Sequence, residues 1–118
     1  MNNEVSYCLD KSLRLDIIKV KNVIFSQLNN PQIFLFGSIA KGCYSKYSDI
    51  DILILIDSNK SVKELRLLKH SIEDAIEDVD VYRKVDIKLY NKNRYNELCK
   101  EPGFEKSILE NLVDIRSW

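Results

Sequence analysis

The stretch FGSIAKGCYSKYSDIDILILI, residues 36–56, decides the fold of this chain. A short apolar run over 32–36 leads into it and stops abruptly at Gly37-Ser38. A continuous apolar run of this kind is typical of a strand that is covered on both faces. The second run, 50–56, alternates strictly: one face would carry acidic residues and leucines, and the other face only isoleucines. We therefore expect two strands of one sheet.

The segments around these two strands complete the first half of the chain. Residues 39–43 have room only for a turn or a short helix, and the polar residues 44–48 are typical of a loop. Before the first strand, residues 12–28 are predicted to form a helix, with Asp10 or Ser12 as candidate N-caps. Its apolar stripe consists of Leu13, Ile17, Val20, Ile24 and Leu28.

A second helix and a third strand are expected after residue 56. Ser61 and Glu64 have the spacing of a capping box, in which each side chain satisfies a free backbone N–H of the first turn. The apolar stripe that follows consists of Leu65, Leu68, Ile72, Ala75, Ile76 and Val79. Residues 85–90 alternate again, and Asp86 lies on their polar side.

The C-terminal part carries weaker signals. Helices are expected over 94–100 and 106–112, separated by a turn at Pro102-Gly103, and an edge strand over 113–116. The whole pattern predicts an α/β (α+β) fold, a small mixed sheet of three to five strands with helices packed on it. The length of 118 residues predicts one domain over 1–118.

Composition excludes several classes of protein. Lys and Arg together number 18, as do Asp and Glu, so the formal net charge is zero and direct nucleic-acid binding through bulk charge is not expected. Cys8, Cys43 and Cys99 are an odd number without a CxxC motif, which indicates neither a disulfide framework nor a zinc site. No apolar run is long enough for a membrane span. We therefore expect a cytoplasmic protein.

The acidic residues of the central strands have the pattern of a metal site. Asp49 and Asp51 lie two residues apart on one strand and would project to the same side. Asp86 would join them if the third strand lies beside the second. Carboxylates are ligands that Mg²⁺ prefers, and two such ions can stabilise both the attacking and the leaving oxygen of an in-line displacement. The predicted catalytic and metal-binding residues are therefore Asp49, Asp51 and Asp86, with two Mg²⁺ ions.

The turn between the strands has features of a phosphate site. Gly37 permits close approach of the backbone to a ligand, and Ser38 offers a hydroxyl and a backbone N–H. Lys41 adds a cation in the same turn. Gly37 and Gly42 have the glycine spacing of a Walker A loop, but Cys43-Tyr44 stands where that loop needs Lys-Ser/Thr. We predict that Gly37, Ser38 and Lys41 bind a nucleotide.

Taken together, these residues resemble the DNA polymerase β-type nucleotidyltransferase superfamily. The resemblance rests on the motif G-S-x10-D-x-D, formed by Gly37, Ser38, ten intervening residues, Asp49 and Asp51, and on the later strand acid Asp86. It implies a polymerase β-like nucleotidyltransferase core that uses ATP as substrate with Mg²⁺.

The superfamily resemblance covers residues 32–90, and the small size of the chain further resembles the minimal nucleotidyltransferases. In that family the nucleotidyltransferase is the antitoxin of a toxin–antitoxin pair, and its partner is a HEPN ribonuclease toxin. Some members transfer AMP from ATP to a tyrosine of the toxin. The resemblance therefore implies an adenylyltransferase, a HEPN-domain partner and a homo- or hetero-oligomer.

One position departs from the family pattern. Many relatives have basic residues on both sides of the alanine in the turn, whereas this chain has Ile39-Ala40-Lys41. Phosphate binding would then be weaker, or would depend on another cation such as Lys46.

Two other functions stay open at this stage. The chain could neutralise its partner by binding alone, with a vestigial site, and inhibition that survives EDTA without ATP would distinguish this case. Alternatively, it could act as a stand-alone transferase on a small hydroxylated molecule, with a pocket between two subunits. An acidic run on the second helix is expected to be a solvated face, and steering of a basic partner is a further option for it. That run consists of Glu73, Asp74, Glu77 and Asp78.

Overall fold

The sheet has four strands in the order β3-β2-β1-β4 in the computed structural model, which describes residues 9–118. The strands are β1 (Gln32–Phe36), β2 (Ile50–Ile56), β3 (Val85–Asn91) and β4 (Val113–Asp114). The helices are α2 (Lys11–Gln27), α3 (Gly37–Lys41), α4 (Val62–Glu77), α5 (Lys92–Leu98) and α6 (Phe104–Leu109). β1 is antiparallel to β2 and β4, whereas β2 and β3 are parallel. The predicted class, an α+β fold with a small mixed sheet, is confirmed.

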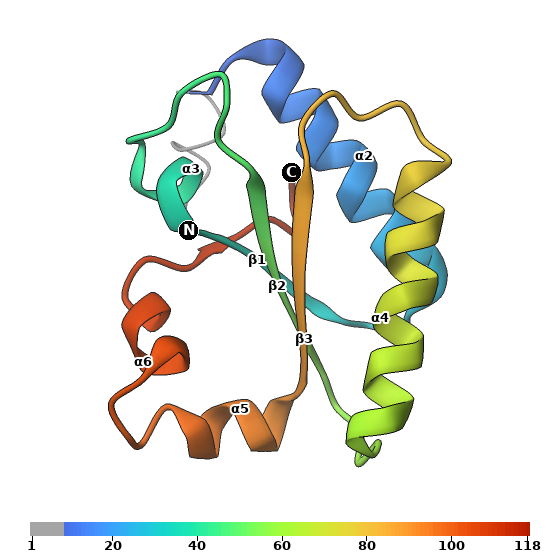
Figure 1. Cartoon of the computed structure of the whole chain (residues 1–118), viewed down its shortest axis with the longest axis vertical. Coiled ribbons are helices and arrows are strands. Elements are labelled where there is room, and N and C mark those ends of the chain that lie inside the picture. The colour runs from blue at the N-terminus through green and yellow to red at the C-terminus, as the bar shows by residue number, and fades with distance from the viewer. Residues whose placement is uncertain (1–8) are drawn as a thin grey trace.

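One face of the sheet is covered by α2 and α4 (Figure 1). The isoleucines of β2 lie on this face, and Ile50, Ile52 and Ile54 are fully buried, as strict alternation predicts. The capping box at the start of α4 is also confirmed, because Glu64 N–H donates to Ser61 Oγ and Ser61 N–H donates to Glu64 Oε1. This side contains most of the buried apolar side chains of the described residues and is the main hydrophobic core.

The opposite face is covered by α5 and α6. A smaller apolar cluster there includes Leu53, Leu55 and Tyr95. The Tyr95 hydroxyl donates to the Glu105 backbone carbonyl at 3.0 Å, and the Tyr90 hydroxyl donates to Glu105 Oε2 at 2.8 Å. These bonds fix α6 against β3 and α5. Because burial and the neighbouring Glu105 carboxylate both disfavour the phenolate, the pKa of Tyr90 is raised.

The predicted boundaries are close in the first three quarters of the chain. The strands over 32–36 and 50–56 are confirmed, and the first helix is shifted by one residue from the predicted 12–28. Asp10 is its N-cap, but its side chain makes no capping hydrogen bond. The expected turn or short helix at 39–43 is a helix that already begins at Gly37.

The C-terminal boundaries differ more from the prediction. β3 passes directly into α5, which begins at Lys92 and not at residue 94, and α6 begins at Phe104 and not at residue 106. The expected strand over 113–116 ends at Asp114. The chain forms a tight local turn after Asp114, because the backbone N–H and the guanidinium of Arg116 both donate to the Asp114 carboxylate.

Two further expectations concern cysteines and membranes. Cys43 and Cys99 are free thiols, whereas Cys8 lies outside the described residues. Within residues 9–118, none of the helices has the length and apolar character needed to cross a membrane.

Candidate functional site

Two predicted carboxylates lie side by side on the neighbouring strands β2 and β3. β2 and β3 pair in a register that sets Asp51 directly beside Asp86. Both lie on the α5 and α6 side of the sheet, because the isoleucines at alternate positions of β2 occupy the other face. Asp49 precedes β2 by one residue. The sequence predicted that these three residues come together, and the register brings at least Asp51 and Asp86 into adjacent positions.

The surroundings of the Asp51 carboxyl group disfavour its ionised form. Its pKa is raised to about 6, first by burial and then by the negative charges of Asp86 and Asp49, while Lys88 acts in the opposite direction. Like charges this close disfavour ionisation of one another. A bound cation would relieve this repulsion, so the geometry and the electrostatics of these strands both favour a cation at Asp51.

Gly37 lies against the same carboxylate. Its φ is +76°, a left-handed conformation that side chains rarely adopt, and a Cβ atom here would overlap Asp51 Oδ2 and lie 3.1 Å from Asp51 Cγ. The absence of a side chain therefore lets the first turn of α3 approach the Asp51 carboxylate. This contact joins the Gly-Ser turn and the acidic strand into one site.

The turn itself is closed by a second glycine. Gly42 has a φ of +78°, and its N–H bonds to the Ile39 carbonyl while Cys43 N–H bonds to the Ser38 carbonyl, which ends α3 after five residues. Ile39 is fully buried in the main core. The side chain that replaces a basic residue of the family pattern therefore packs inside the fold.

Lys41 ends α3 and is exposed. The lysine whose charge acts on Asp51 is Lys88, not Lys41. Lys88 was not singled out from the sequence. Its Nζ lies 3.7 Å from Asp86 Oδ2 and 5.9 Å from the centre of the Phe104 ring. The available signal was its position two residues after Asp86, which places both side chains on one face of β3.

Arg83 is the second residue that sequence reasoning missed. Its guanidinium donates to the Ser45 carbonyl at 2.7 Å and to the Ser48 carbonyl at 2.8 Å, and it lies 5.7 Å from the centre of the Tyr44 ring. It thereby ties the loop before Asp49 to the segment before β3. No pattern in the sequence pointed to it, because its partners are backbone oxygens about 35 residues earlier.

The tyrosines of this loop differ from each other. Tyr44 packs on the main core, and the Arg83 guanidinium lies over its ring. Tyr47 is 81% exposed, with Lys46 Nζ 5.1 Å from its ring centre. Tyr47 is thus the aromatic side chain of the loop that is free to contact a ligand.

The site's side chains are suited to a metal ion that a substrate helps to hold. Within residues 9–118, no three His, Cys, Asp or Glu side chains form a group that would hold a metal by themselves. Mg²⁺ does not require such a cage, because it binds through one or two carboxylates together with substrate phosphates and water. The pair Asp51 and Asp86 matches that donor set.

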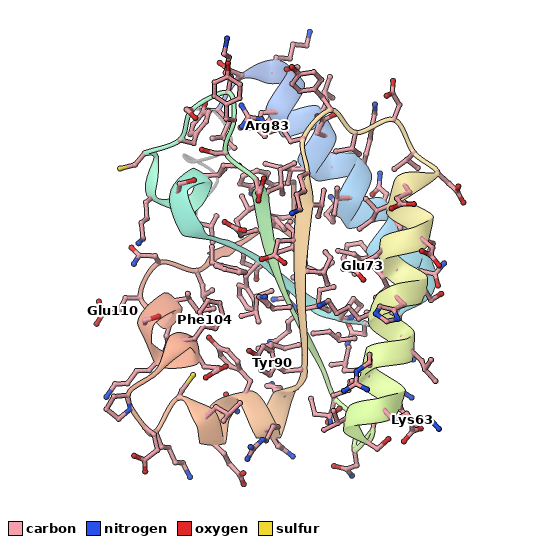
Figure 2. All side chains as sticks on the ribbon, in the orientation of Figure 1. Lys63, Glu73, Arg83, Tyr90, Phe104 and Glu110 are labelled. Carbon is pink, nitrogen blue, oxygen red and sulfur yellow. The ribbon has the colours of Figure 1, made fainter. Side chains whose placement is uncertain are left out.

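Figure 2 shows the surroundings of this face. Phe104 and Tyr90 lie on one side of β3, and Glu73 and Lys63 lie on the α4 side. The Phe104 ring packs edge-on against Phe36 at 5.7 Å between ring centres. The N-terminal end of α6 therefore lines the face that carries the carboxylates.

A mixed sheet with paired acids beside a Gly-Ser turn defines a class of site for polyphosphate substrates. The comparison with protein families makes this specific: the model of the nucleotidyltransferase domain family matches residues 17–115. The chain belongs to that family, and its fold is consistent with a polymerase β-like nucleotidyltransferase. No curated protein matches the sequence.

Proposed function

We propose that this chain is a minimal nucleotidyltransferase that acts as an antitoxin, by transferring AMP from ATP to a tyrosine of a HEPN ribonuclease toxin. The observation that carries the proposal is the register of Asp51 beside Asp86, with Gly37 against the same carboxylate. Membership of the nucleotidyltransferase family supports the chemistry. The partner and the cytoplasmic location are part of the proposal and follow from the resemblance to minimal nucleotidyltransferases.

The proposed reaction is one in-line displacement. The acceptor hydroxyl oxygen bonds to the α-phosphorus of ATP, and the bond from this phosphorus to the oxygen bridging to the β-phosphorus breaks. Pyrophosphate leaves with that electron pair, and the hydroxyl proton passes to the Asp86 carboxylate. Two Mg²⁺ ions, held by Asp49, Asp51 and Asp86, would neutralise the charge that develops on the phosphate oxygens.

The chain's own residues position the substrates. Gly37 and Ser38 would receive the triphosphate against the first turn of α3, beside Asp51. Lys41 and Lys88 would supply positive charge, and Arg83 keeps the loop before Asp49 in place. Catalysis would then come mainly from positioning and charge neutralisation.

The test pairs this chain with a HEPN ribonuclease, the class of partner that the proposal names. With ATP and Mg²⁺, mass spectrometry should find AMP on a tyrosine of that protein, and its ribonuclease activity should fall. Asp49→Ala or Asp51→Ala should abolish the modification. Undiminished transfer by either variant would contradict the proposed mechanism.

Two alternatives have distinct outcomes in the same assay. If the chain neutralises by binding alone, inhibition will be complete in EDTA without ATP and will persist in Asp51→Ala. If the acceptor is a small hydroxylated molecule, the HEPN protein will remain unmodified while ATP is still consumed in the presence of the true acceptor. The raised pKa of the half-buried Asp51 carboxyl group favours the catalytic function, because an unused site has no need for crowded carboxylates.

A further inference from the structure

β3 is an edge strand. It ends the strand order, and in Figure 1 it lies in front of β2 with no helix in front of it. Ile50 N–H donates to the Lys84 carbonyl at 2.8 Å, so the backbone groups of Lys84 point toward β2. Because the direction alternates along a strand, the N–H and carbonyl groups of Val85, Ile87 and Leu89 point to the open edge. Among residues 9–118, no strand pairs with that edge.

The edge is bordered by one side of α4. Residues of α4 and β3 line two hollows along it, one at each end of β3. The hollow at the C-terminal end of β3 is apolar with a basic rim: Val62, Leu65, Leu89, Leu98, Arg66, Lys69 and Arg94 are among its lining residues. The hollow at the N-terminal end is lined from α4 by Glu73, Asp74 and Glu77.

The charge on this side of α4 therefore changes from positive to negative along the helix. Arg66 and Lys69 lie in the first half, and Glu73 and Glu77 in the second half, all at helical spacing on one stripe. The acidic hollow also contains Lys84 and Arg83, but the Arg83 guanidinium donates to the loop before Asp49. A surface of this kind is complementary to a reversed copy of itself.

We propose that this edge binds a second copy of the chain, with the two β3 strands antiparallel about a two-fold axis. The two sheets would then form one continuous eight-stranded sheet. Because that axis is perpendicular to the sheet, both α4 helices lie on the same face and run antiparallel to each other. The basic half of each α4 then faces the acidic half of the other.

The charges on β3 select one register. Antiparallel strands exchange hydrogen bonds only between residues whose backbone groups point outward. Pairing Val85 with the partner's Ile87 would set Asp86 opposite the partner's Asp86. Pairing Ile87 with the partner's Leu89 would set Lys88 opposite the partner's Lys88. Only Ile87 opposite the partner's Ile87 sets Asp86 against the partner's Lys88, and opposite charges stabilise such pairs.

In this register the partner's Lys88 lies beside the carboxylate pair. Asp86 already has its own Lys88 at 3.7 Å, so each site would be bordered by two lysines. The interface itself depends only on the open edge and the α4 stripe, and it would hold even if the site had no enzymatic activity.

The experiment measures association of the full chain by sedimentation equilibrium. We expect a reversible dimer of the 13.8 kDa chain, and its association should weaken with salt. Lys69→Glu should raise the dissociation constant at least ~10-fold, and adding Glu73→Lys should restore it to within about threefold, because the charges are then exchanged as a pair. Lys63→Glu makes the same charge change on α4 outside both hollows and should have little effect.

Amide hydrogen exchange tests the edge itself. At high protein concentration the amides of Val85, Ile87 and Leu89 should be protected, and on dilution this protection should be lost. The amides of Asp86 and Lys88 should stay protected throughout, because they bond to β2. A monomer at millimolar concentration, or a dimer that leaves the three outward amides unprotected and ignores Lys69→Glu, would overturn the proposal.

Discussion

The two faces of β2 have opposite roles. One face holds Ile50, Ile52 and Ile54, which are fully buried under α2 and α4. The other face begins with Asp51, whose carboxyl group is crowded by Asp49 and Asp86. Because strand side chains alternate, one seven-residue strand carries core side chains on one face and the mutually repelling carboxylates of the site on the other. Substitutions on the two faces should therefore have separable effects.

The largest expected effect is on the acidic face. Asp51→Asn should reduce nucleotidyl transfer by roughly a thousandfold, since it removes the charge at the centre of the site. The thermal midpoint of the metal-free protein should not fall, because the substitution also removes a half-buried charge beside Asp86. Transfer rates and thermal unfolding measure the two effects. Asp57→Asn, just beyond β2 and exposed, is the control and should change neither.

The isoleucine face should give the reverse result. Ile52→Ala removes a fully buried side chain and leaves a cavity between β2 and the helices, which should lower the free energy of unfolding by about 2–5 kcal/mol. Activity per folded molecule should stay within about threefold, since Ile52 points away from the site. Urea unfolding and initial rates below the transition test this. A loss of activity without loss of stability would show that the faces are not independent.

The two left-handed glycines allow a matched comparison. Gly42→Ala should cost about 1–2 kcal/mol of stability, since its φ is positive, and Gly37→Ala should cost at least as much, since its φ is also positive. Only Gly37→Ala also places a methyl group against the Asp51 carboxylate. A methyl group at position 42 would have no neighbouring atom within 4 Å. Transfer should therefore fall strongly in Gly37→Ala and little in Gly42→Ala. Equal activity in the two variants would mean that the turn does not shape the site.

The smallest effect concerns pH. The pKa of Asp51 is raised from 3.8 to about 6 in the folded protein, so between these values the folded state keeps a proton that the unfolded state has released. The stability of the metal-free protein should therefore fall as pH rises from about 4 to 6, relative to Asp51→Asn, and the difference should be constant above that range. Chemical unfolding of both proteins at several pH values measures it. A difference that does not change with pH would mean that the Asp51 pKa is not raised.

Local patterns predicted the parts of the fold that local chemistry determines. The alternation of 50–56 predicted the strand and which side chains share each of its faces, and Ser61 with Glu64 marked the start of α4. The ends of α5, α6 and β4 were predicted less well. They depend on contacts between distant segments, such as the Tyr90 hydroxyl with Glu105 and the return of Arg116 to Asp114.

The site was predictable where it follows a motif and not where it follows three-dimensional packing. The motif that links Gly37, Ser38, Asp49 and Asp51 predicted a single site, and the structure sets Gly37 against the Asp51 carboxylate. The roles of Asp49, Asp51 and Asp86 remain predictions. Arg83 binds backbone oxygens of a distant loop, so no spacing along the chain reveals it. Lys88 lies two residues after Asp86 on the same strand, and only this spacing pointed to it. The burial of Ile39 was equally hidden, because its position in the turn suggested a ligand contact and its side chain enters the core.

The fate of each phosphate of ATP tests the central claim most directly. The purified chain, the HEPN protein proposed as its partner and Mg²⁺ are incubated with ATP labelled at either the α- or the γ-phosphate. The account predicts that the α-label becomes attached to the partner, that the γ-label leaves in pyrophosphate, and that both outcomes vanish in Asp51→Asn but persist in Asp57→Asn. Attachment of the γ-label, or α-label transfer that survives Asp51→Asn, would contradict it.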